Sequence, residues 1–230
     1  MDFGAKIITQ IGGVNITQTM MNTWIIIIVL TIVALILRSK INKFTDVPTT
    51  KLQNIVELII ETMENFTIQN IGEKYKYFGN WFFGVFCFIL TSNYIGLLSF
   101  RSPTADLATT LALSLSTFTL IHFMGIKVNG GAYFKGYIEP MPVLLPLNII
   151  GEIATPISLS LRLFGNILGG TIIMGLINSA LSQGPILLQV VGFGAITPVL
   201  HAYFDVFAGF LQTFIFVILS MTFIKDKIGE

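Results

Sequence analysis

Two very long apolar segments constrain the fold of this chain more than any other feature. They cover about residues 143–181 and 186–224, and the short polar turn Ser182-Gln-Gly-Pro185 separates them. As a single helix, each segment would be about 55–60 Å long, roughly twice the thickness of the hydrocarbon core of a bilayer. Each segment therefore either folds into two spans or forms one strongly inclined or bent helix, with Pro156 and Pro198 as candidate bends.

The composition places the whole chain in a membrane. Of its 230 residues, 53% are hydrophobic and 11% are charged, whereas soluble domains carry about 25% charged residues. The single cysteine, Cys87, excludes an internal disulfide,. No phosphate-binding glycine loop, CxxC motif or histidine cluster is present,. We therefore expect no cofactor and no metal, and the net charge of +1 gives no indication of a nucleic-acid partner.

Three shorter apolar segments precede the long pair, and each can cross a membrane once. We expect these spans at about residues 23–40, 77–100 and 107–126,. The last of them follows Asp106, whose side chain can cap the start of a helix. The chain then has five spans if each long segment is one inclined helix, or seven if each folds into two.

The segment of about residues 48–72 does not predict a span. Leu52, Ile55 and Ile59 belong to a row of apolar residues at helical spacing, and charged side chains occupy the other faces. This pattern indicates an amphipathic helix that lies on the membrane surface or against a partner. We interpret residues 1–230 as a single membrane domain of the all-α polytopic class.

The distribution of basic residues predicts the orientation of the chain. With the N-terminus outside and the spans crossing in turn, most lysines and arginines face the cytoplasm, as the positive-inside rule requires. Only Lys6 and Arg101 then lie outside, and the C-terminus is cytoplasmic. Seven spans give the same orientation, so charge does not decide the number of spans. The basic residues expected inside are Arg38, Lys40, Lys43, Lys51, Lys74, Lys76, Lys127, Lys135, Lys225 and Lys227.

Charged residues are nearly absent from the long pair. Between Pro140 and Ile224 there are three, which are Glu152, Arg162 and Asp205. An unpaired guanidinium in hydrocarbon costs roughly 3 kcal/mol on insertion scales and on the order of 10 or more in simulations. It does not lose its proton as a lysine can. A chain that keeps such a residue is expected to use it on ions, so Arg162 is the primary candidate functional residue.

Polar residues accompany this arginine along the first long segment. At 100° per residue, Thr155, Ser158 and Asn166 fall within about one stripe with Arg162 on a helix,. These residues are therefore candidates for a polar path along the segment.

The second long segment carries a polar stripe of its own, made of His201, Asp205 and Gln212. If the two segments form an antiparallel hairpin, Gln212 lies at the depth of Arg162. Asp205 then lies nearer the outer surface and Glu152 nearer the cytoplasm. This arrangement predicts two polar half-paths on opposite sides of one fixed positive charge.

Structural interpretations stay open for several of these residues. Asn166 and Ser158 are of types that often only join helices inside a membrane. His201 is spaced to pair with Asp205 and pack its helix. For His122, on an apolar helix, a structural histidine is the simpler interpretation.

Several motifs give the chain a specific resemblance. The run Ser-Leu-Ser-Leu-Arg162-Leu-Phe-Gly-Asn166 resembles subunit a of the bacterial F-type ATP synthase. The later run Gln212-Thr-Phe-Ile-Phe-Val-Ile-Leu is similar to the terminal helix of that family, and the stretches around Asn93 and Pro103 also fit. The resemblance covers the chain from about residue 75 to the end.

This resemblance implies a non-catalytic stator subunit of the bacterial plasma membrane. Its partners would be a ring of c subunits, the peripheral stalk subunit b and the rest of the complex. Five spans are implied, the last two steeply inclined against the ring. Arg162 would face the ring carboxylates, with Asn166 and Gln212 as polar neighbours. Two half-channels would load and unload H⁺ or Na⁺ and so couple ion flow to ATP synthesis.

Two positions depart from the common pattern of that family. Many members have a glutamate nine residues after the arginine, where this chain has Thr171. Seven residues before the glutamine, where others have His, Gly or Glu, this chain has Asp205. We therefore expect the outer half-channel to keep one carboxylate, moved to the opposite helix.

Two other classes of function are consistent with an apolar chain of this length. A self-contained secondary ion transporter binds its substrate near the midplane but usually shows inverted repeats, and no clear repeat of the Arg162 segment is present. A structural scaffold would not need Arg162. The choice between H⁺ and Na⁺ depends mainly on the carboxylate of the ring subunit, which is another chain.

Overall fold

The computed structural model describes residues 7–11, 13–42, 44, 50–98, 100–138 and 141–229. Lys6 and Lys43, which we assigned to opposite sides of the membrane, lie outside the described residues. Within these ranges, five helices are long and apolar enough to span a membrane: Gln18–Ile41, Glu73–Leu98, Leu107–Asn129, Pro142–Ser182 and Ile186–Ile228. The chain is therefore a multi-pass α-helical membrane protein, and the five-span alternative is confirmed, since each long segment runs as one helical unit.

The N-terminal part begins with a hairpin that the sequence did not predict. Strands β1 (Ile7–Ile11) and β2 (Val14–Thr17) pair antiparallel, and Gly13 between them has a φ of +83°. Helix α1 (Gln18–Ile41) follows, and the Thr17 hydroxyl caps it by accepting the Met20 N–H.

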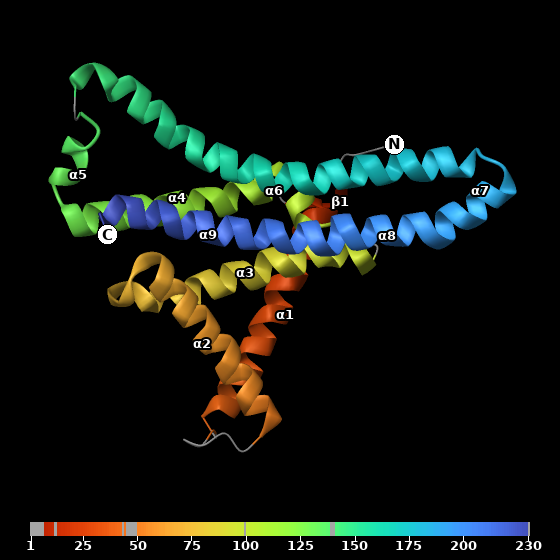
Figure 1. The fold of residues 1–230 in the computed structure, drawn as a ribbon, viewed down its shortest axis with the longest axis horizontal. Helices are drawn as coiled ribbons and strands as arrows, with labels where there is room; N and C mark the ends of the chain where they lie inside the picture. Colours follow the sequence, from red (N-terminus) through yellow and green to blue (C-terminus); the bar gives the residue numbers. More distant parts are fainter. Residues whose placement is uncertain are drawn as a thin grey trace.

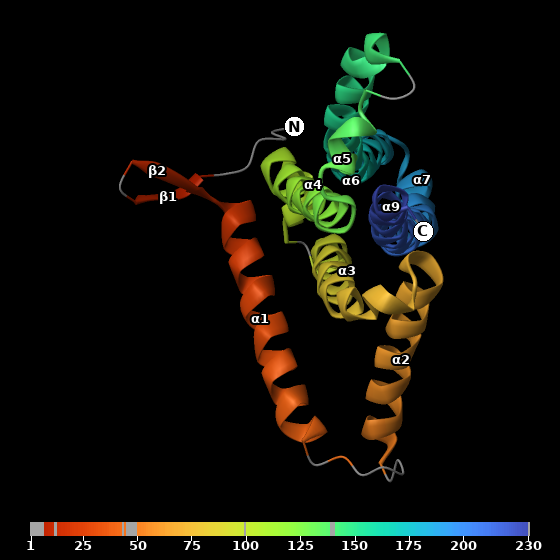
Figure 2. The ribbon, with the colours of Figure 1, turned by 90° about the vertical axis from the view of Figure 1, so that its left-hand side faces the viewer.

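Helix α2 (Lys51–Ile71) is amphipathic and only partly covered by the rest of the chain. The Thr50 side chain caps its start, and Gly72 ends it with a φ of +106°. Apolar side chains of its first half, such as Ile55 and Leu58, are exposed. In Figure 2, α1 and α2 both extend away from the remaining helices.

The middle of the chain ties the start of α1 to the start of α4. Here η1 (Glu73–Phe78), α3 (Gly79–Tyr94), η2 (Ile95–Leu98) and η3 (Pro103–Ala105) lead to α4 (Leu107–Asn129). Asp106 accepts the Ala108 N–H at 3.1 Å, which confirms the predicted cap. Its other carboxylate oxygen accepts from the Thr19 hydroxyl at 3.0 Å, and Asn22 donates to the Arg101 carbonyl at 2.7 Å.

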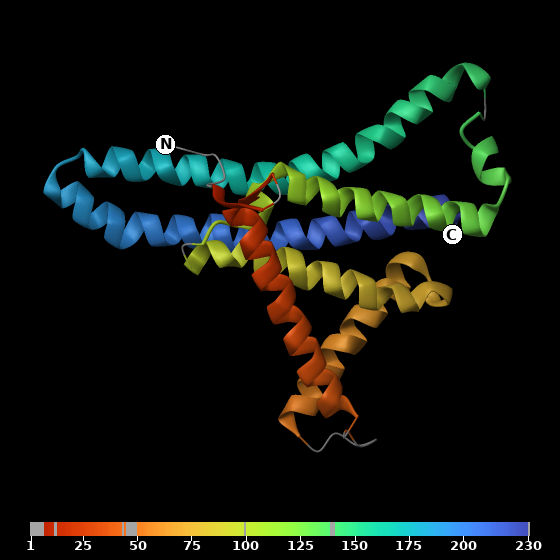
Figure 3. The ribbon, with the colours of Figure 1, turned by 180° about the vertical axis from the view of Figure 1, so that it is seen from behind.

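The last part of the chain is a long hairpin. Helix α5 (Ala132–Lys135) and η4 (Pro142–Leu144) lead to α6 (Leu145–Ser182), which contains Pro156 and bends visibly (Figure 1). The returning arm consists of α7 (Ile186–Val191), η5 (Gly192–Ile196), α8 (Thr197–His201), η6 (Ala202–Ala208) and α9 (Gly209–Ile228). Both η5 and η6 are π-helical turns within an otherwise continuous helix. Figures 1 and 3 show the second half of α6 beside the returning arm, whereas the first half of α6 slopes away from α9.

Two apolar clusters hold α3, α4 and the hairpin together. The larger cluster joins α2, α3, α4 and the C-terminal half of α9. The smaller cluster consists of Ile89, Leu159, Leu163 and Phe216, of which each is 2% exposed or less, and it locks the middle of α6 against α3 and α9. The larger cluster contains Ile71, Tyr75, Phe82, Ile121, Met124, Val217, Met221, Ile224 and Ile228.

Candidate functional site

The antiparallel register of the hairpin is set by close side-chain packing. Leu163 of α6 and Phe216 of α9 belong to the same buried cluster. Further along α6, Gly170 packs on η6 so closely that a Cβ there would lie 3.5 Å from the Cβ of Phe204. Gln212 lies between Phe204 and Phe216, and therefore faces the stretch of α6 between Leu163 and Gly170. That stretch begins one residue after Arg162.

Around Arg162 the structure combines an exposed charge with buried amides. The Arg162 side chain is on the exposed side of α6 and forms no ion pair or hydrogen bond with any described residue. Asn166 and Gln212 each have a buried amide nitrogen without a hydrogen-bond partner in the described part of the chain. Leaving a buried donor unpaired costs about 1–3 kcal/mol. The amides of Asn166 and Gln212 therefore do not stabilise the fold, and another reason is needed for their presence at this depth.

A cavity of about 510 Å³ opens beside this level, and we call it the Asp205 cavity. On α6 its lining runs from Asn166 to Asn178, and Thr171 lies on it. On the other arm His201 and Asp205 line it, so the two positions that depart from the common family pattern face one space from opposite helices.

His201 and Asp205 form a close pair in the wall of this cavity. His201 Nδ1 lies 2.6 Å from Asp205 Oδ2, and the two side chains are 45% and 26% exposed. The pair lies at the start of the π-helical turn η6, and π-turns recur at functional sites,. The pairing that we considered as a structural interpretation is present, and it is also accessible from the cavity.

Asn93 fixes the backbone that follows the Asp205 turn. Its amide nitrogen donates to the Gly209 carbonyl at 3.0 Å, and its carbonyl oxygen accepts from the Thr104 hydroxyl at 2.8 Å. Gly209 is needed here, since a Cβ would lie only 3.3 Å from the Cβ of Asn93. The sequence drew attention to Asn93 only within a motif, although a lone amide in an apolar span is itself a signal of a buried contact.

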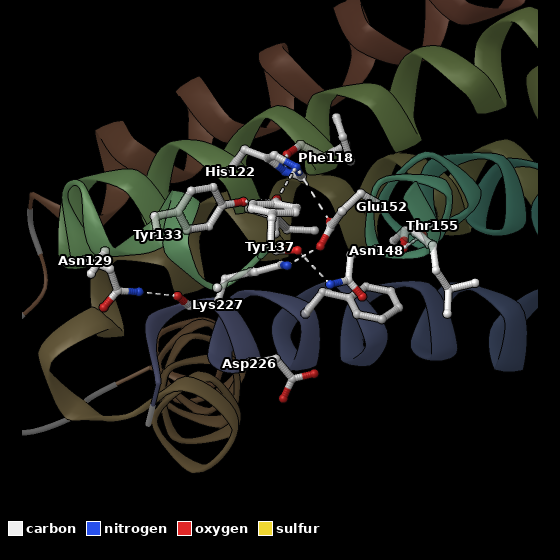
Figure 4. A pocket seen from close by; sticks show the side chains of 16 residues that line it. Phe118, His122, Asn129, Tyr133, Tyr137, Asn148, Glu152, Thr155, Asp226 and Lys227 are labelled. Carbon is white, nitrogen blue, oxygen red and sulfur yellow. Dashed lines mark hydrogen bonds and ion pairs between the residues drawn. The ribbon is translucent and has the colours of Figure 1, made fainter. Parts of the chain in front are cut away.

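A second cavity, of about 730 Å³, lies near the other end of the hairpin, and we call it the Glu152 cavity (Figure 4). Glu152 and Thr155 of α6 line it, as the sequence predicted for one path. Ser158 does not line it and instead lies on the exposed face of α6. The remaining walls come from α4, α5, the turn after α5 and α9.

Glu152 is held by groups that the sequence did not connect with it. Lys227 Nζ contacts its Oε1, and His122 Nε2 lies 3.6 Å from its Oε2 (Figure 4). Lys227 carries no local signal for this role, because its partner is 75 positions away in the chain. His122, which we interpreted as structural, therefore lies beside a carboxylate in a cavity.

Two tyrosines close the same wall. The Tyr133 and Tyr137 hydroxyls are 2.7 Å apart, and Lys227 Nζ lies over both rings. Burial, the Tyr137 hydroxyl and the nearby Glu152 charge raise the pKa of Tyr133. This phenol therefore stays neutral and contributes a hydroxyl, not a charge, to the cavity.

The two cavities are separated along α6. The Glu152 cavity reaches Thr155 and the Asp205 cavity begins at Asn166, which is roughly 16 Å along a helix. Between them, Leu159 and Leu163 are buried in the smaller apolar cluster, and the buried Ser160 hydroxyl is hydrogen-bonded to that of Thr110 at 3.0 Å. Arg162 lies in this gap, on the exposed side of the helix. No group of three or more His, Cys, Asp or Glu side chains able to hold a metal was found among the residues that the structure describes.

Comparison with known proteins gives consistent results. The family model "ATP synthase A chain" matches residues 20–225. The "ATP synthase subunit a" of Bacillus subtilis is 34% identical over 100% of this chain and 99% of its own length. The protein of that name from Syntrophobacter fumaroxidans is 35% identical over 90% and 82%. The "ATP synthase subunit a, sodium ion specific" of Propionigenium modestum is 31% identical over 99% and 80%.

The packing of Gly170 on Phe204 makes the hairpin register testable. Disulfides need Cβ atoms about 3.5–4.5 Å apart. In a Cys87→Ser background, Gly170→Cys with Phe204→Cys should oxidise to a disulfide, seen by mass spectrometry as the loss of two free thiols. The control pair Gly169→Cys with Phe204→Cys should stay reduced, because a Cβ at Gly169 meets no atom within 4 Å. Cross-linking of the control pair instead would mean a different register.

Proposed function

The chain belongs to the ATP synthase A chain family, and we propose that it is the ion-translocating stator subunit a of an F-type ATP synthase. The subunit itself carries out no chemical reaction on ATP. It works with a ring of c subunits, the peripheral stalk subunit b and the catalytic head in a bacterial plasma membrane.

One observation carries the proposed mechanism: two separate cavities end on either side of Arg162. The Asp205 cavity and the Glu152 cavity are not joined inside the subunit, because the apolar cluster of Leu159 and Leu163 fills the space between them. An ion that enters one cavity cannot reach the other through this chain alone. Another molecule must carry the ion past the exposed side of α6. In the proposed mechanism a carboxylate of the c ring is this carrier.

The exposed side of α6 suits a closely packed partner helix. A Cβ at Gly165 or Gly169 would meet no atom of this chain within 4 Å, so these glycines are not used for packing within the subunit. Small residues let a second helix approach closely in a membrane. Ser158 and Arg162 are exposed on the same helix. This arrangement supports a c-ring helix as the partner and brings its carboxylate near the guanidinium.

Electrostatics then gives the direction of ion exchange. A guanidinium close to a carboxyl favours the ionised form, since a nearby opposite charge lowers the pKa of the carboxyl. A ring site that approaches Arg162 therefore releases its ion into one cavity, and after it has passed the arginine it takes up an ion from the other. One charge that moves down 100 mV releases about 2.3 kcal/mol, and several ions per turn supply enough for ATP synthesis.

The positive-inside rule gives the orientation with the N-terminus outside and the C-terminus in the cytoplasm, and two sets of contacts support the alternation of the spans. At one end, Asn129, the last residue of α4, donates to the Lys227 carbonyl, and Lys227 contacts Glu152. At the other, Thr19 in the first turn of α1 donates to Asp106, the residue that caps the start of α4. The ends of α4 and α9 therefore lie together and apart from the start of α1, as five alternating spans require. We assign the Glu152 cavity to the cytoplasmic side and the Asp205 cavity to the outer side.

Arg162→Ala should abolish ATP-driven ion pumping in membrane vesicles while the complex still assembles. The fixed charge that ionises the ring carboxylate is lost, so the rate should fall to the level of vesicles without ATP. Arg162→Lys should also be severely impaired, because a lysine is a differently hydrated point charge that can deprotonate. Arg38→Ala, at the exposed end of α1, is the matched control and should pump normally. Normal pumping by Arg162→Ala would exclude the proposed function.

Asp205→Asn should slow ion flux strongly, by roughly tenfold or more, since it removes the carboxylate of the outer cavity. Adding Thr171→Glu should restore part of the flux, because the two positions line the same cavity from opposite helices. Flux through reconstituted complexes decides this. Near-normal flux in the single variant, with no change from the second substitution, would show that Asp205 only pairs with His201.

A further inference from the structure

His122 presents one defined nitrogen to the Glu152 cavity. Its Nδ1 lies 3.0 Å from the Phe118 carbonyl oxygen, which can only accept a hydrogen bond,. Nδ1 therefore carries the hydrogen of the neutral ring, and the lone pair is on Nε2. Nε2 in turn faces Oε2 of Glu152 at 3.6 Å and the Tyr137 hydroxyl oxygen at 3.5 Å (Figure 4). This lone pair thus faces both a carboxylate and a phenol hydroxyl.

The two oxygens of Glu152 are divided between two partners. Lys227 contacts Oε1, whereas Oε2 lies at ion-pair distance from the His122 imidazole. In the neutral ring, the Nε2 lone pair faces the negatively charged Oε2. A proton added at Nε2 would replace this contact with a charge-assisted hydrogen bond from Nε2 to Oε2. Lys227 and Glu152 already balance each other, so the cluster gains one positive charge with the proton. The titratable groups that line this cavity beside His122 are Tyr133, Tyr137, Glu152, Asp226 and Lys227.

The histidine is also accessible, unlike a buried structural one. Its side chain is 23% exposed and that of Glu152 is 20% exposed, both toward the cavity. Histidine is the side chain that takes up and releases a proton in the physiological pH range. The geometry combines a fixed tautomer, a facing carboxylate and a path to water.

We propose that His122 is the proton-exchanging residue of the Glu152 cavity, and that the ion passing through this cavity is therefore H⁺. Nε2 accepts a proton from hydronium in the cavity, and the N–H bond forms as the hydronium O–H bond breaks. Oε2 of Glu152 holds the imidazolium until Nε2 returns the proton to water or passes it inward. Nδ1 keeps its hydrogen on the Phe118 carbonyl throughout. This inference rests on the proposed function, which assigns the cavity to the cytoplasmic half-channel.

The test uses the complete ATP synthase reconstituted in liposomes, with the pH on the cytoplasmic side varied from about 6 to about 8. His122→Gln keeps a polar side chain but cannot titrate. Its rate of ATP-driven pumping should fall by roughly tenfold or more and lose its dependence on this pH. Glu152→Gln should also lower the rate, because the carboxylate that holds the imidazolium is gone. Ser116→Ala, on the exposed face of α4, should keep the wild-type profile.

The outcomes separate this inference from the proposed function. An unchanged pH profile in His122→Gln, or a rate that follows Na⁺ concentration and not pH, overturns the role of His122. If Arg162→Ala still abolishes pumping in that case, the stator function stands. Normal pumping by both His122→Gln and Arg162→Ala would contradict the proposed stator function as well.

A direct measurement on the unsubstituted complex avoids any failure of the variants to assemble. Hydrogen exchange at the imidazole C2 of His122, followed by mass spectrometry, reports whether the ring titrates. Exchange that varies sigmoidally with pH and changes in Glu152→Gln supports the inference. Exchange that does not vary with pH overturns it.

Discussion

The separation of two cavities by an apolar barrier beside a permanent charge is the constraint on which the site depends. Leu159 and Leu163 seal the interior of the hairpin against α3 and α9, while Arg162 stands on the outer side of the same turns. In the proposed mechanism, an open interior would let ions leak through the subunit without doing work. Without the guanidinium, a ring carboxylate could pass the barrier with its ion still bound. The barrier and the charge act together, and they occupy one stretch of one helix.

The two cavities are built in different ways, and this gives each a different chemistry. The Asp205 cavity lies mainly between the arms of the hairpin, where a π-helical turn carries the His201–Asp205 pair and Asn93 holds the backbone behind it. The Glu152 cavity gathers side chains from α4, α5, α6 and α9, and Lys227 closes it from the C-terminal end. Arg101 and its neighbours in the connection between α3 and α4 complete the wall of the Asp205 cavity.

The sequence predicted the parts of this structure that local patterns determine. Apolar length gave the spans, and spacing gave the shared depth of Arg162 and Gln212, because helical periodicity is a property of the segment itself. The contact of Lys227 with Glu152 and the orientation of His122 toward the same carboxylate could not be predicted, since each depends on how several helices pack. Apolar length alone left five or seven spans open, because an apolar segment does not encode its own tilt; the resemblance implied five, and the fold confirms it.

The central claim is that water reaches Arg162 from two sides without joining, and thiol accessibility tests it most directly. In the assembled complex with Cys87→Ser, Thr155→Cys and Thr171→Cys would be exposed to a thiol reagent that does not cross membranes, applied from one side at a time. The account predicts that Thr155→Cys reacts only from the cytoplasm and Thr171→Cys only from outside. Reaction of either position from both sides would reveal a continuous water path and contradict the account.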